Sequence, residues 1–452
     1  LMKIRILQYR DVIESMRFDG SYHNADVNVY DSVIKKHSHH KLSHYCSEIF
    51  STGRNKRTYT TPEFGYPFLS NSDVVAAEPF MSCKYCSRKY DFDDKAVLKA
   101  GMILTGRVGA IGQTSFVPSY LEKAKAMGSD NIIRIVVKSE YRKGFIYAYL
   151  SSKMGQLSFW KYATGGVQPF ITETMVGSLP VPNFSEALQK KIDDLILEST
   201  KLREDAFDKL KEAQDLILNE LRINISKRYF GKVSISSIMQ SHNSRFEANF
   251  HISEGADIDR YLWSQYKCKP LGNLCTSISR PNIFKRYYVN HGITFLGGAD
   301  IFLATPNSDK QLSKKKTENI NDLLIEEGTI LLPRSGTIGN VAWAHAGHAQ
   351  KLASEDVIRL KPNDILRGGY LFAFLSTSIG RSLIQKHIFG SVIQHVEAPH
   401  LSLIPIPILD DRIISHAHEK VITYSKSMGE AIKKESQAIA LVEQEIESWN
   451  KK

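Results

Sequence analysis

Cysteine and histidine residues in the first quarter of the chain have a spacing that could bind a metal ion. Cys83 and Cys86 form a CxxC pair, and Cys46 lies upstream of it in a histidine-rich stretch. Three thiolates and one imidazole make up a Cys3His zinc site. The candidate imidazoles belong to His37, His39, His40 and His44.

No second CxxC follows at zinc-ribbon spacing, and the second half of the chain has no counterpart of this motif. We therefore favour free thiols and predict no metal site. A zinc-dependent nucleic-acid enzyme centred on Cys46, Cys83 and Cys86 is the alternative hypothesis.

The signatures of common enzymes are absent from the sequence. It contains no phosphate-binding GxxxxGK[ST] loop, no HExxH or GxSxG motif, no kinase set and no dinucleotide-binding GxGxxG at a helix start. The Asn/Asp-Pro-Pro-Tyr/Phe tetrapeptide of amino-methyltransferases is also missing, and the acidic residues form no convincing nuclease cluster. The sequence thus favours binding over catalysis, with no cofactor.

Two basic loops at corresponding positions, 51–59 and 279–288, contain the residue types that bind phosphates and read base edges. A solvated basic turn is the ordinary alternative, but the repetition favours DNA contact. The residues predicted to bind DNA are Arg54, Asn55, Lys56, Arg57 and Tyr59 in the first loop, and Arg280, Lys285, Arg286 and Tyr287 in the second.

Two glycine-containing turns, 106–109 and 333–337, each carry an arginine where the backbone could approach a partner closely. A structural salt bridge of that arginine is an equally open alternative. Further downstream, a glycine-containing loop offers glutamine for adenine and lysine for phosphate, and we pair Gln168 with Gln394 in it. The DNA-binding residues predicted in these segments are Arg107, Lys161, Gln168, Arg334, Ser335, Ser391 and Gln394.

These candidates recur because the chain is a tandem duplication. The offset between matched residues hardly drifts, from 228 positions between Arg17 and Arg245 to 225 between Leu179 and Ile404. The matched segments are 17–23 with 245–251, 56–59 with 285–288, 101–112 with 328–339, 133–135 with 358–360, and 179–182 with 404–407.

Each half is predicted to be an α+β target-recognition domain with a twisted mixed β-sheet. Apolar runs such as 131–137 indicate strands, and short helices are expected near 145–152 and 370–377. A Pro-x-Pro element closes each domain, since proline imposes extended backbone. The predicted boundaries are 1–182 and 225–408 for the domains, and 183–224 and 409–452 for long spacer helices.

Long helices are expected from about 185 to 221 and from 411 to 449. Apolar and small residues recur in each at steps of three and four, the spacing of a two-helix coiled coil. The seam of the second helix is predicted to run from Ile414 through Glu435 and Glu445 to Trp449. Equivalent halves usually pack about a pseudo-twofold axis, so we expect an antiparallel intramolecular coiled coil. It would be roughly 54 Å long and act as a spacer.

The composition fits a polyanionic partner. The 452 residues carry a formal net charge of +11, which favours binding to phosphates. No stretch approaches the roughly 18 apolar residues of a membrane span, and no signal segment is recognisable, so a cytoplasmic protein without membrane contact is expected.

The order of these elements, present twice, resembles the specificity subunit of type I restriction–modification systems. The resemblance rests on the arginine–glycine turn before the Leu352–Leu360 strand, on Tyr370–Arg381, on Gly390-Ser391, and on Ile404–Ile408 before a long helix. It covers essentially the whole chain. The first half departs from it at Gly165–Pro169, and the Cys83/Cys86 pair is an addition.

The resemblance implies two target-recognition domains, each reading one half of a split site in double-stranded DNA. It also implies helices that set the gap and dock two methyltransferase subunits, joined by endonuclease/translocase subunits. The chain itself would do no chemistry. The specificity subunit of a type II-like system is a second alternative.

Overall fold

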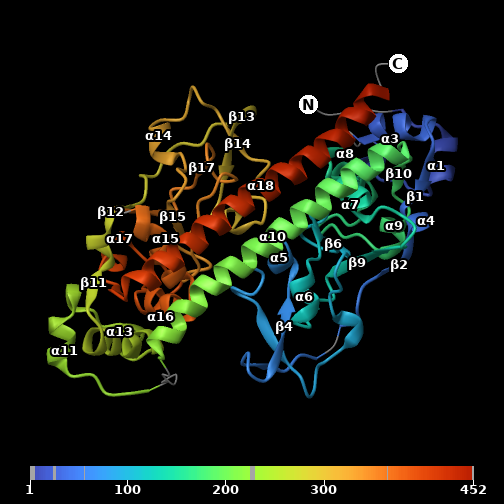
Figure 1. Cartoon of the computed structure of the whole chain (residues 1–452). Coiled ribbons are helices and arrows are strands. Elements are labelled where there is room, and N and C mark those ends of the chain that lie inside the picture. The colour runs from blue at the N-terminus through green and yellow to red at the C-terminus, as the bar shows by residue number, and fades with distance from the viewer. Residues whose placement is uncertain (1–5, 24–26, 55, 224–229, 364, 450–452) are drawn as a thin grey trace. The chain divides into compact units, whose positions relative to one another are not determined.

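The structure is a computed structural model that describes residues 6–23, 27–54, 56–223, 230–363 and 365–449. It divides into two compact units, whose elements are labelled in Figure 1. The first unit consists of residues 1–204 and 430–452, and the second of residues 205–429. Each unit mixes helices and sheets, as the sequence predicts, and each contains part of both long helices.

The described residues of the first unit form two four-stranded sheets and a small two-stranded ladder. One sheet is antiparallel throughout, and the other is mixed because β4 and β8 run parallel. In spatial order, the strands are β2 (Cys46–Phe50), β9 (Ile132–Val137), β6 (Ile103–Gly106) and β7 (Thr114–Phe116) in the first sheet, and β3 (Tyr59–Thr60), β5 (Lys84–Ser87), β4 (Gly65–Leu69) and β8 (Met127–Gly128) in the second.

Short helices connect and cover these strands. They are α1 (Tyr9–Ser15), α2 (Gly20–His23), α3 (Val27–Lys36), α4 (Leu42–Tyr45), α5 (Asn71–Val74), α6 (Ser119–Lys123), α7 (Lys143–Ser151), α8 (Lys153–Tyr162) and α9 (Glu173–Gly177). The main core lies around α7, whose residues from Gly144 to Leu150 are all buried. Ile192 and Ile196 of α10 and Val442 of α18 belong to the same core, so the long helices are integral to the unit.

The second unit repeats this plan. Its strands are β12 (Cys275–Ser279), β18 (Val357–Pro362), β15 (Ile330–Pro333) and β16 (Ala342–Trp343) in one sheet, and β14 (Gln311–Leu312), β13 (Tyr288–Leu296) and β17 (Leu352–Ala353) in the other. Its helices are α11 (Ile235–Gln240), α12 (Ala248–His251), α13 (Glu254–Gln265), α14 (Ile320–Leu323), α15 (Ile365–Ser376), α16 (Ser378–Lys386) and α17 (Ala398–Leu401).

The Pro-x-Pro elements are extended, as expected, but they also form strands of their own. β10 (Pro180–Pro182) pairs antiparallel with β1 (His39–Lys41), and β19 (Pro405–Pro407) pairs in the same way with β11 (Cys268–Pro270). Each two-stranded ladder ties the end of a domain to a segment near its beginning. The sequence pattern did not indicate these partners, because the pairing residues lie far apart in the chain.

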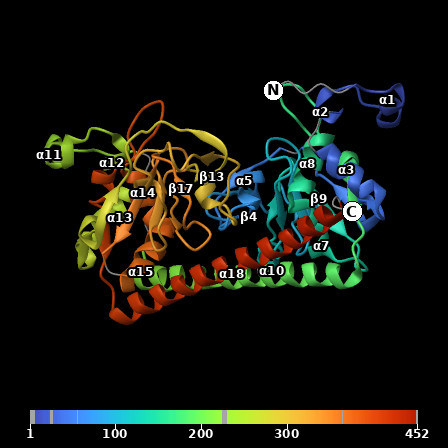
Figure 2. The ribbon, with the colours of Figure 1, turned by 90° about the horizontal axis from the view of Figure 1, so that it is seen from above.

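The long helices agree closely with the expected bounds: α10 spans Glu186–Leu221 and α18 spans Asp411–Trp449. Within each unit, Figures 1 and 2 show a stretch of α10 (green) alongside a stretch of α18 (red). In the first unit, Ser199 Oγ donates to the carbonyl oxygen of Ala431 at 2.8 Å. In the second unit, Lys420 pairs with Glu212.

The polar seam residue Glu435 is buried and has two partners in the first unit. Its carboxylate accepts from Tyr147 Oη at 2.5 Å and from Arg203 Nη2 at 2.6 Å. A buried carboxylate is tolerated at a helix seam when it is paired in this way. Near the C-terminal end the expected seam is off by one residue, because Ile446 rather than Glu445 is the buried side chain.

Candidate nucleic-acid interface

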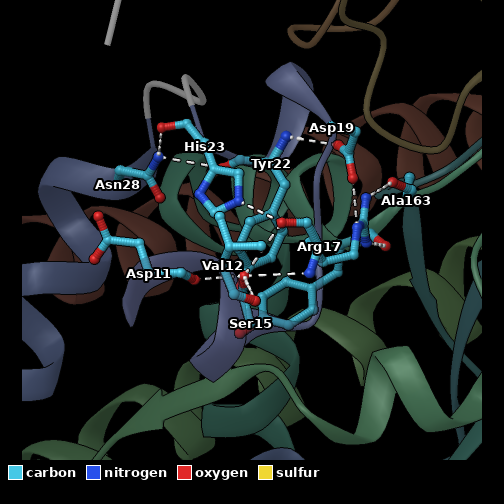
Figure 3. Close-up of polar contacts among 10 residues, drawn as sticks. Asp11, Val12, Ser15, Arg17, Asp19, Tyr22, His23, Asn28 and Ala163 are labelled. Atoms are coloured by element: carbon cyan, nitrogen blue, oxygen red, sulfur yellow. Dashed lines mark hydrogen bonds and ion pairs between the residues drawn. The ribbon is translucent and has the colours of Figure 1, made fainter. Parts of the chain in front are cut away.

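An arginine near the start of each unit clamps the end of a helix. Figure 3 shows Arg17, whose Nη1 and Nη2 donate to the carbonyl oxygens of Tyr162 and Ala163 at 3.1 and 3.0 Å. Asp19 pairs with Arg17 Nε at 2.5 Å, and the ring of His23 bonds to the arginine's own carbonyl at 2.7 Å. These carbonyls lie at the C-terminal end of α8, where a cation satisfies exposed acceptors and the helix dipole.

The second unit contains the same clamp. Arg245 donates to the carbonyls of His387 and Ile388 at 3.3 and 3.0 Å, pairs with Glu247 at 3.0 Å, and accepts a bond from the ring of His251 at 2.7 Å. The repeated Arg-Phe-Asp/Glu motif is therefore a structural device. Its recurrence was visible in the sequence, but its partners were not.

A narrow hairpin follows each clamped helix. Thr164 and Phe170 exchange both backbone hydrogen bonds at 2.8 and 2.7 Å, and Phe389 and His395 do so at 3.0 and 2.8 Å. Five residues form the tip in each case, and the first is a glycine with positive φ, +100° in Gly165. Only glycine adopts that conformation without strain.

The bridged necks correct one predicted pairing of residues between the halves. Counted from Thr164 and Phe389, Gln168 corresponds to Ile393, and Gln394 corresponds to Pro169. The pairing of Gln168 with Gln394 was therefore wrong by one position. The two tips are Gly-Gly-Val-Gln-Pro and Gly-Ser-Val-Ile-Gln, and both present a glutamine, but not at the same place.

The arginine–glycine turn packs against each hairpin. Val108 bridges to Phe170, and the carbonyl of Arg107 accepts from Ile171 N at 3.0 Å. In the second unit Ser335 bridges to His395, and the carbonyl of Arg334 accepts from Val396 N at 3.0 Å. In each unit the clamp thus holds the helix end through guanidinium-to-carbonyl hydrogen bonds, and backbone hydrogen bonds join the hairpin to the arginine turn.

In the first unit this arrangement borders a hollow of about 430 Å³. Its lining includes three of the predicted DNA-binding residues, Arg54, Arg107 and Gln168, together with Asp130, Asn131 and Phe170. Arg54 is 89% exposed and lies 3.8 Å from Asp130. Segments that are far apart in the sequence therefore converge on a single polar, solvent-accessible site.

The second unit places the matching arginines differently. Arg280 and Arg334 share the carboxylate of Glu397, at 3.4 and 2.8 Å, and Arg334 also lies 3.7 Å from Asp356. Counted from the bridged necks, Thr172 is the counterpart of Glu397. Thr172 caps α9 by accepting from Met175 N, so the first unit has no carboxylate at this position.

Two of the predicted basic residues hold their loops in place. Arg57 pairs with Asp130 and stacks over Phe68 at 4.5 Å, and Arg286 pairs with Glu355 at 2.6 Å and stacks over Phe295 at 5.2 Å. The hydrogen bond to Glu355 raises the pKa of Arg286. Both arginines are partly exposed, so they anchor the loop while still facing solvent.

Lys161 lies in the interior. It is only 4% exposed and forms an ion pair with Asp31, and its counterpart Lys386 pairs with Asp259 at 2.6 Å. A lysine buried in this way is poorly placed to meet a phosphate, so we leave Lys161 out of the proposed interface.

The remaining predicted residues lie in loops. Lys56, Lys285, Ser391 and Gln394 are exposed, and Asn55 lies outside the described residues. Tyr59 is 47% exposed beneath Lys84, whose Nζ is 4.6 Å from the ring centre. Tyr287 and Ser335 are half-buried, the former beside Lys285 at 5.3 Å.

Two buried arginines of the repeated Ile-Arg-Ile/Leu strands are structural. Arg134 donates to the carbonyls of Ser129, Ile132, Ala96 and Gly128, and Arg359 donates to the four corresponding carbonyls. Burial lowers the pKa of each guanidinium to about 10. The alternation of apolar and polar residues along a strand predicts which side chains are buried. It did not indicate that the charged side chains of Arg134 and Arg359 are buried.

The cysteines weighed as zinc ligands are not brought together. Cys46 begins β2, whereas Cys86 lies in β5 of the other sheet. Within the described ranges, no group of three or more His, Cys, Asp or Glu side chains is arranged to hold a metal ion. Burial raises the pKa of the Cys46 thiol to about 12, which keeps it protonated at neutral pH.

Comparison with known proteins identifies one region. Residues 264–423 match the family model described as the type I restriction modification DNA specificity domain. The predicted resemblance is thus confirmed, and the matched residues all lie in the second half of the chain. No curated protein matches the chain at a significant level.

Solved structures similar to the chain include two subunits from bacteria. A type I restriction–modification S subunit from M. genitalium is 13% identical, with a TM-score of 0.35, over 91% of this chain and 95% of that one. An HsdS subunit from Thermoanaerobacter tengcongensis is 15% identical, with a TM-score of 0.28, over 90% and 95%.

A search of the described helices finds none that is both long and apolar enough to span a membrane.

Proposed function

We propose that the chain is the sequence-specific DNA-binding subunit of a type I restriction–modification complex. Each half reads one half of a bipartite site in double-stranded DNA. The observation that supports this most directly is the recurrence of the same clamp, hairpin and arginine turn in both units, next to basic side chains. A duplicated interface suits a target made of two half-sites.

The interface residues divide by their proposed roles. Arg54, Lys56 and Lys285 are exposed cations that contact phosphates, which position the protein without reading sequence. Arg107, Gln168 and Gln394 lie at the hairpin and its turn, where they meet base edges. Arg57 and Arg286 keep the loops in shape through their carboxylate partners.

We further propose that α10 and α18 form an antiparallel intramolecular coiled coil that sets the spacing between the half-sites. Their lengths of 36 and 39 residues and their buried seams support this role. The same helices dock two methyltransferase subunits, which carry out the chemistry. Endonuclease/translocase subunits complete the assembly, and this chain has no catalytic role of its own.

The test is to map methylated adenines by single-molecule sequencing in a host that carries the chain and its methyltransferase. We expect one bipartite sequence with a fixed gap. Methylation without any sequence preference, or at a single undivided site, would contradict the proposal.

The spacer role is tested by lengthening both long helices. The four residues Leu-Glu-Ala-Lys, about one helical turn, are inserted into α10, and the same number of residues is inserted into α18. The gap between half-sites should change, and each half-site sequence should stay the same. A matched control replaces four exposed helix residues without changing the helix length. An unaltered gap in the insertion variant would refute the spacer role.

A further inference from the structure

The hairpin tips carry apolar side chains in full contact with solvent. Val167 is completely exposed, Val392 is 94% exposed and Ile393 is 62% exposed. Val167 and Val392 occupy the same position when counted from the bridged necks. A single exposed valine is ordinary on a protein surface. The observation that suggests a shared role is its recurrence at the same tip position of both units.

Each tip projects from an anchored neck, which favours its use in DNA recognition. The neck of each hairpin is closed by two backbone hydrogen bonds, and the preceding helix end is fixed by Arg17 or Arg245. Adding a Cβ at Gly165 would place it 2.7 Å from the carbonyl oxygen of Gln168, so the turn itself is tightly closed. A preorganised element loses little entropy on binding.

The surroundings indicate DNA rather than protein. Gln168, next to Val167, lines the same hollow as Arg54 and Arg107, in a chain of net charge +11. One or two aliphatic side chains are far too small for a stable protein interface, which buries roughly 800 Å² per partner. A two-stranded ribbon does fit the major groove of DNA.

Each tip combines two kinds of side chain, aliphatic and glutamine, that match one base pair. In the major groove an A·T pair presents the N6 and N7 of adenine, which a glutamine amide recognises, and the 5-methyl group of thymine, which apolar side chains contact. The first tip offers Val167 beside Gln168, and the second offers Val392 and Ile393 beside Gln394. G·C pairs have no methyl group for these aliphatic side chains.

We propose that each hairpin tip reads an A·T base pair in its own half-site, with Val167, or Val392 and Ile393, packed on the thymine methyl group. This inference rests on the proposed DNA-recognition function and adds to it a base pair and the residues that read it.

The test uses the full chain with its methyltransferase subunits and a library of duplexes with a randomised region. Wild-type protein should select a bipartite sequence with an A·T pair at one position of each half-site. Val167→Ala should relax that position in one half-site only, and Val392→Ala combined with Ile393→Ala should relax it in the other. Each variant is the matched control for the other, since both only shorten exposed side chains.

The selected site is then synthesised with deoxyuridine in place of single thymines. Removing the methyl group at the position read by the first tip should weaken wild-type binding about fourfold, as expected for one buried methyl group. The same change should have no effect on Val167→Ala, because the contact is already lost.

Three outcomes would overturn the inference or its basis, and they are distinguishable. If wild-type protein selects a bipartite site but tolerates deoxyuridine at every thymine, the tips do not read methyl groups. If Val167→Ala selects the same DNA but no longer retains the methyltransferase, the tip is a protein contact. If wild-type protein selects no sequence, the proposed function itself fails.

Discussion

Arg107 and Arg334 occupy the same turn in their units but differ in electrostatic environment. Arg334 is held by Glu397 and Asp356, whereas the position of Glu397 is a threonine in the first unit. An arginine already neutralised by two carboxylates gains less from a base or phosphate than one facing an open hollow. The sequence left two roles open for these arginines, DNA contact and a structural salt bridge. The salt-bridge role fits Arg334 better than Arg107.

Arg107→Ala should therefore weaken DNA binding more than Arg334→Ala. We expect a loss of about 1–3 kcal/mol for Arg107→Ala, confined to the first half-site, and a smaller loss for Arg334→Ala at the second. Titrations against duplexes with one half-site scrambled would assign each loss. Equal losses, or a larger loss for Arg334→Ala, would show that the ion pairs of Arg334 do not reduce its contribution to DNA binding.

Several residues that the sequence singled out separately lie together in the structure, but the sequence did not indicate their surroundings. Arg54, Arg107 and Gln168 were chosen from separate segments and line one hollow. Lys161 was chosen for its charge, yet Asp31, which is 130 positions away, holds it in the core. Residue type and local pattern carry no information about such distant partners.

At the scale of elements, the long helices were the most predictable feature. Their periodicity is repeated over ten turns, so local exceptions average out. Strands of two or three residues, such as β3 and β10, provide no such averaging. The correspondence between the two hairpins was also missed. It is defined by the bridged necks, which the sequence does not show, and the glutamine in each tip led us to match Gln168 with Gln394.

The clamp is predicted to control the order of the hairpin. In Arg17→Ala the carbonyls of Tyr162 and Ala163 lose their donor, so the end of α8 and the neck after it should loosen. Hydrogen exchange should accelerate at the amides of Thr164 and Phe170. We expect most of the effect to be local, because Asp19 and His23, which also contact Arg17, lie within six residues of it in the chain.

Arg245→Ala is the matched control, and it should affect the amides of Phe389 and His395 while Thr164 and Phe170 keep their protection. Unchanged exchange at both necks in the two variants would mean that the hairpins do not depend on the clamps. Lys substitutions should restore part of the protection, since an ammonium group can still donate to one carbonyl.

At the scale of the whole molecule, the duplication is the property that the sequence conveyed best. Ion pairs such as Lys161–Asp31 and Arg57–Asp130 recur as Lys386–Asp259 and Arg286–Glu355. The two units nevertheless differ in buried histidines. His348 of the second unit is 2% exposed, and its Nε2 lies 2.9 Å from the carbonyl oxygen of Ile301.

Acid should destabilise the second unit through His348. Burial lowers the pKa of His348 to about 4 from an ordinary value of 6.5. Between these values the unfolded chain binds a proton that the folded chain does not, so stability falls as the pH decreases from 6.5 towards 4. The loss should be on the order of 3 kcal/mol at most.

Chemical denaturation of the full chain at several pH values would measure this dependence. His348→Gln keeps a donor for Ile301 but cannot titrate, so its stability should change less between pH 6.5 and 4. The same pH dependence in wild type and variant would exclude His348 as the group responsible.

The two hairpin tips contain the same number of residues between their bridged necks, so the sequence of one tip can be exchanged for that of the other. Five residues separate Thr164 from Phe170, and five separate Phe389 from His395. Replacing 165–169 by the sequence of 390–394 leaves the closing hydrogen bonds and the leading glycine in place. If the chain has the proposed function, a lineage that recombines such short stretches would in one step change the sequence that one half of the chain reads and leave the rest of the fold unchanged.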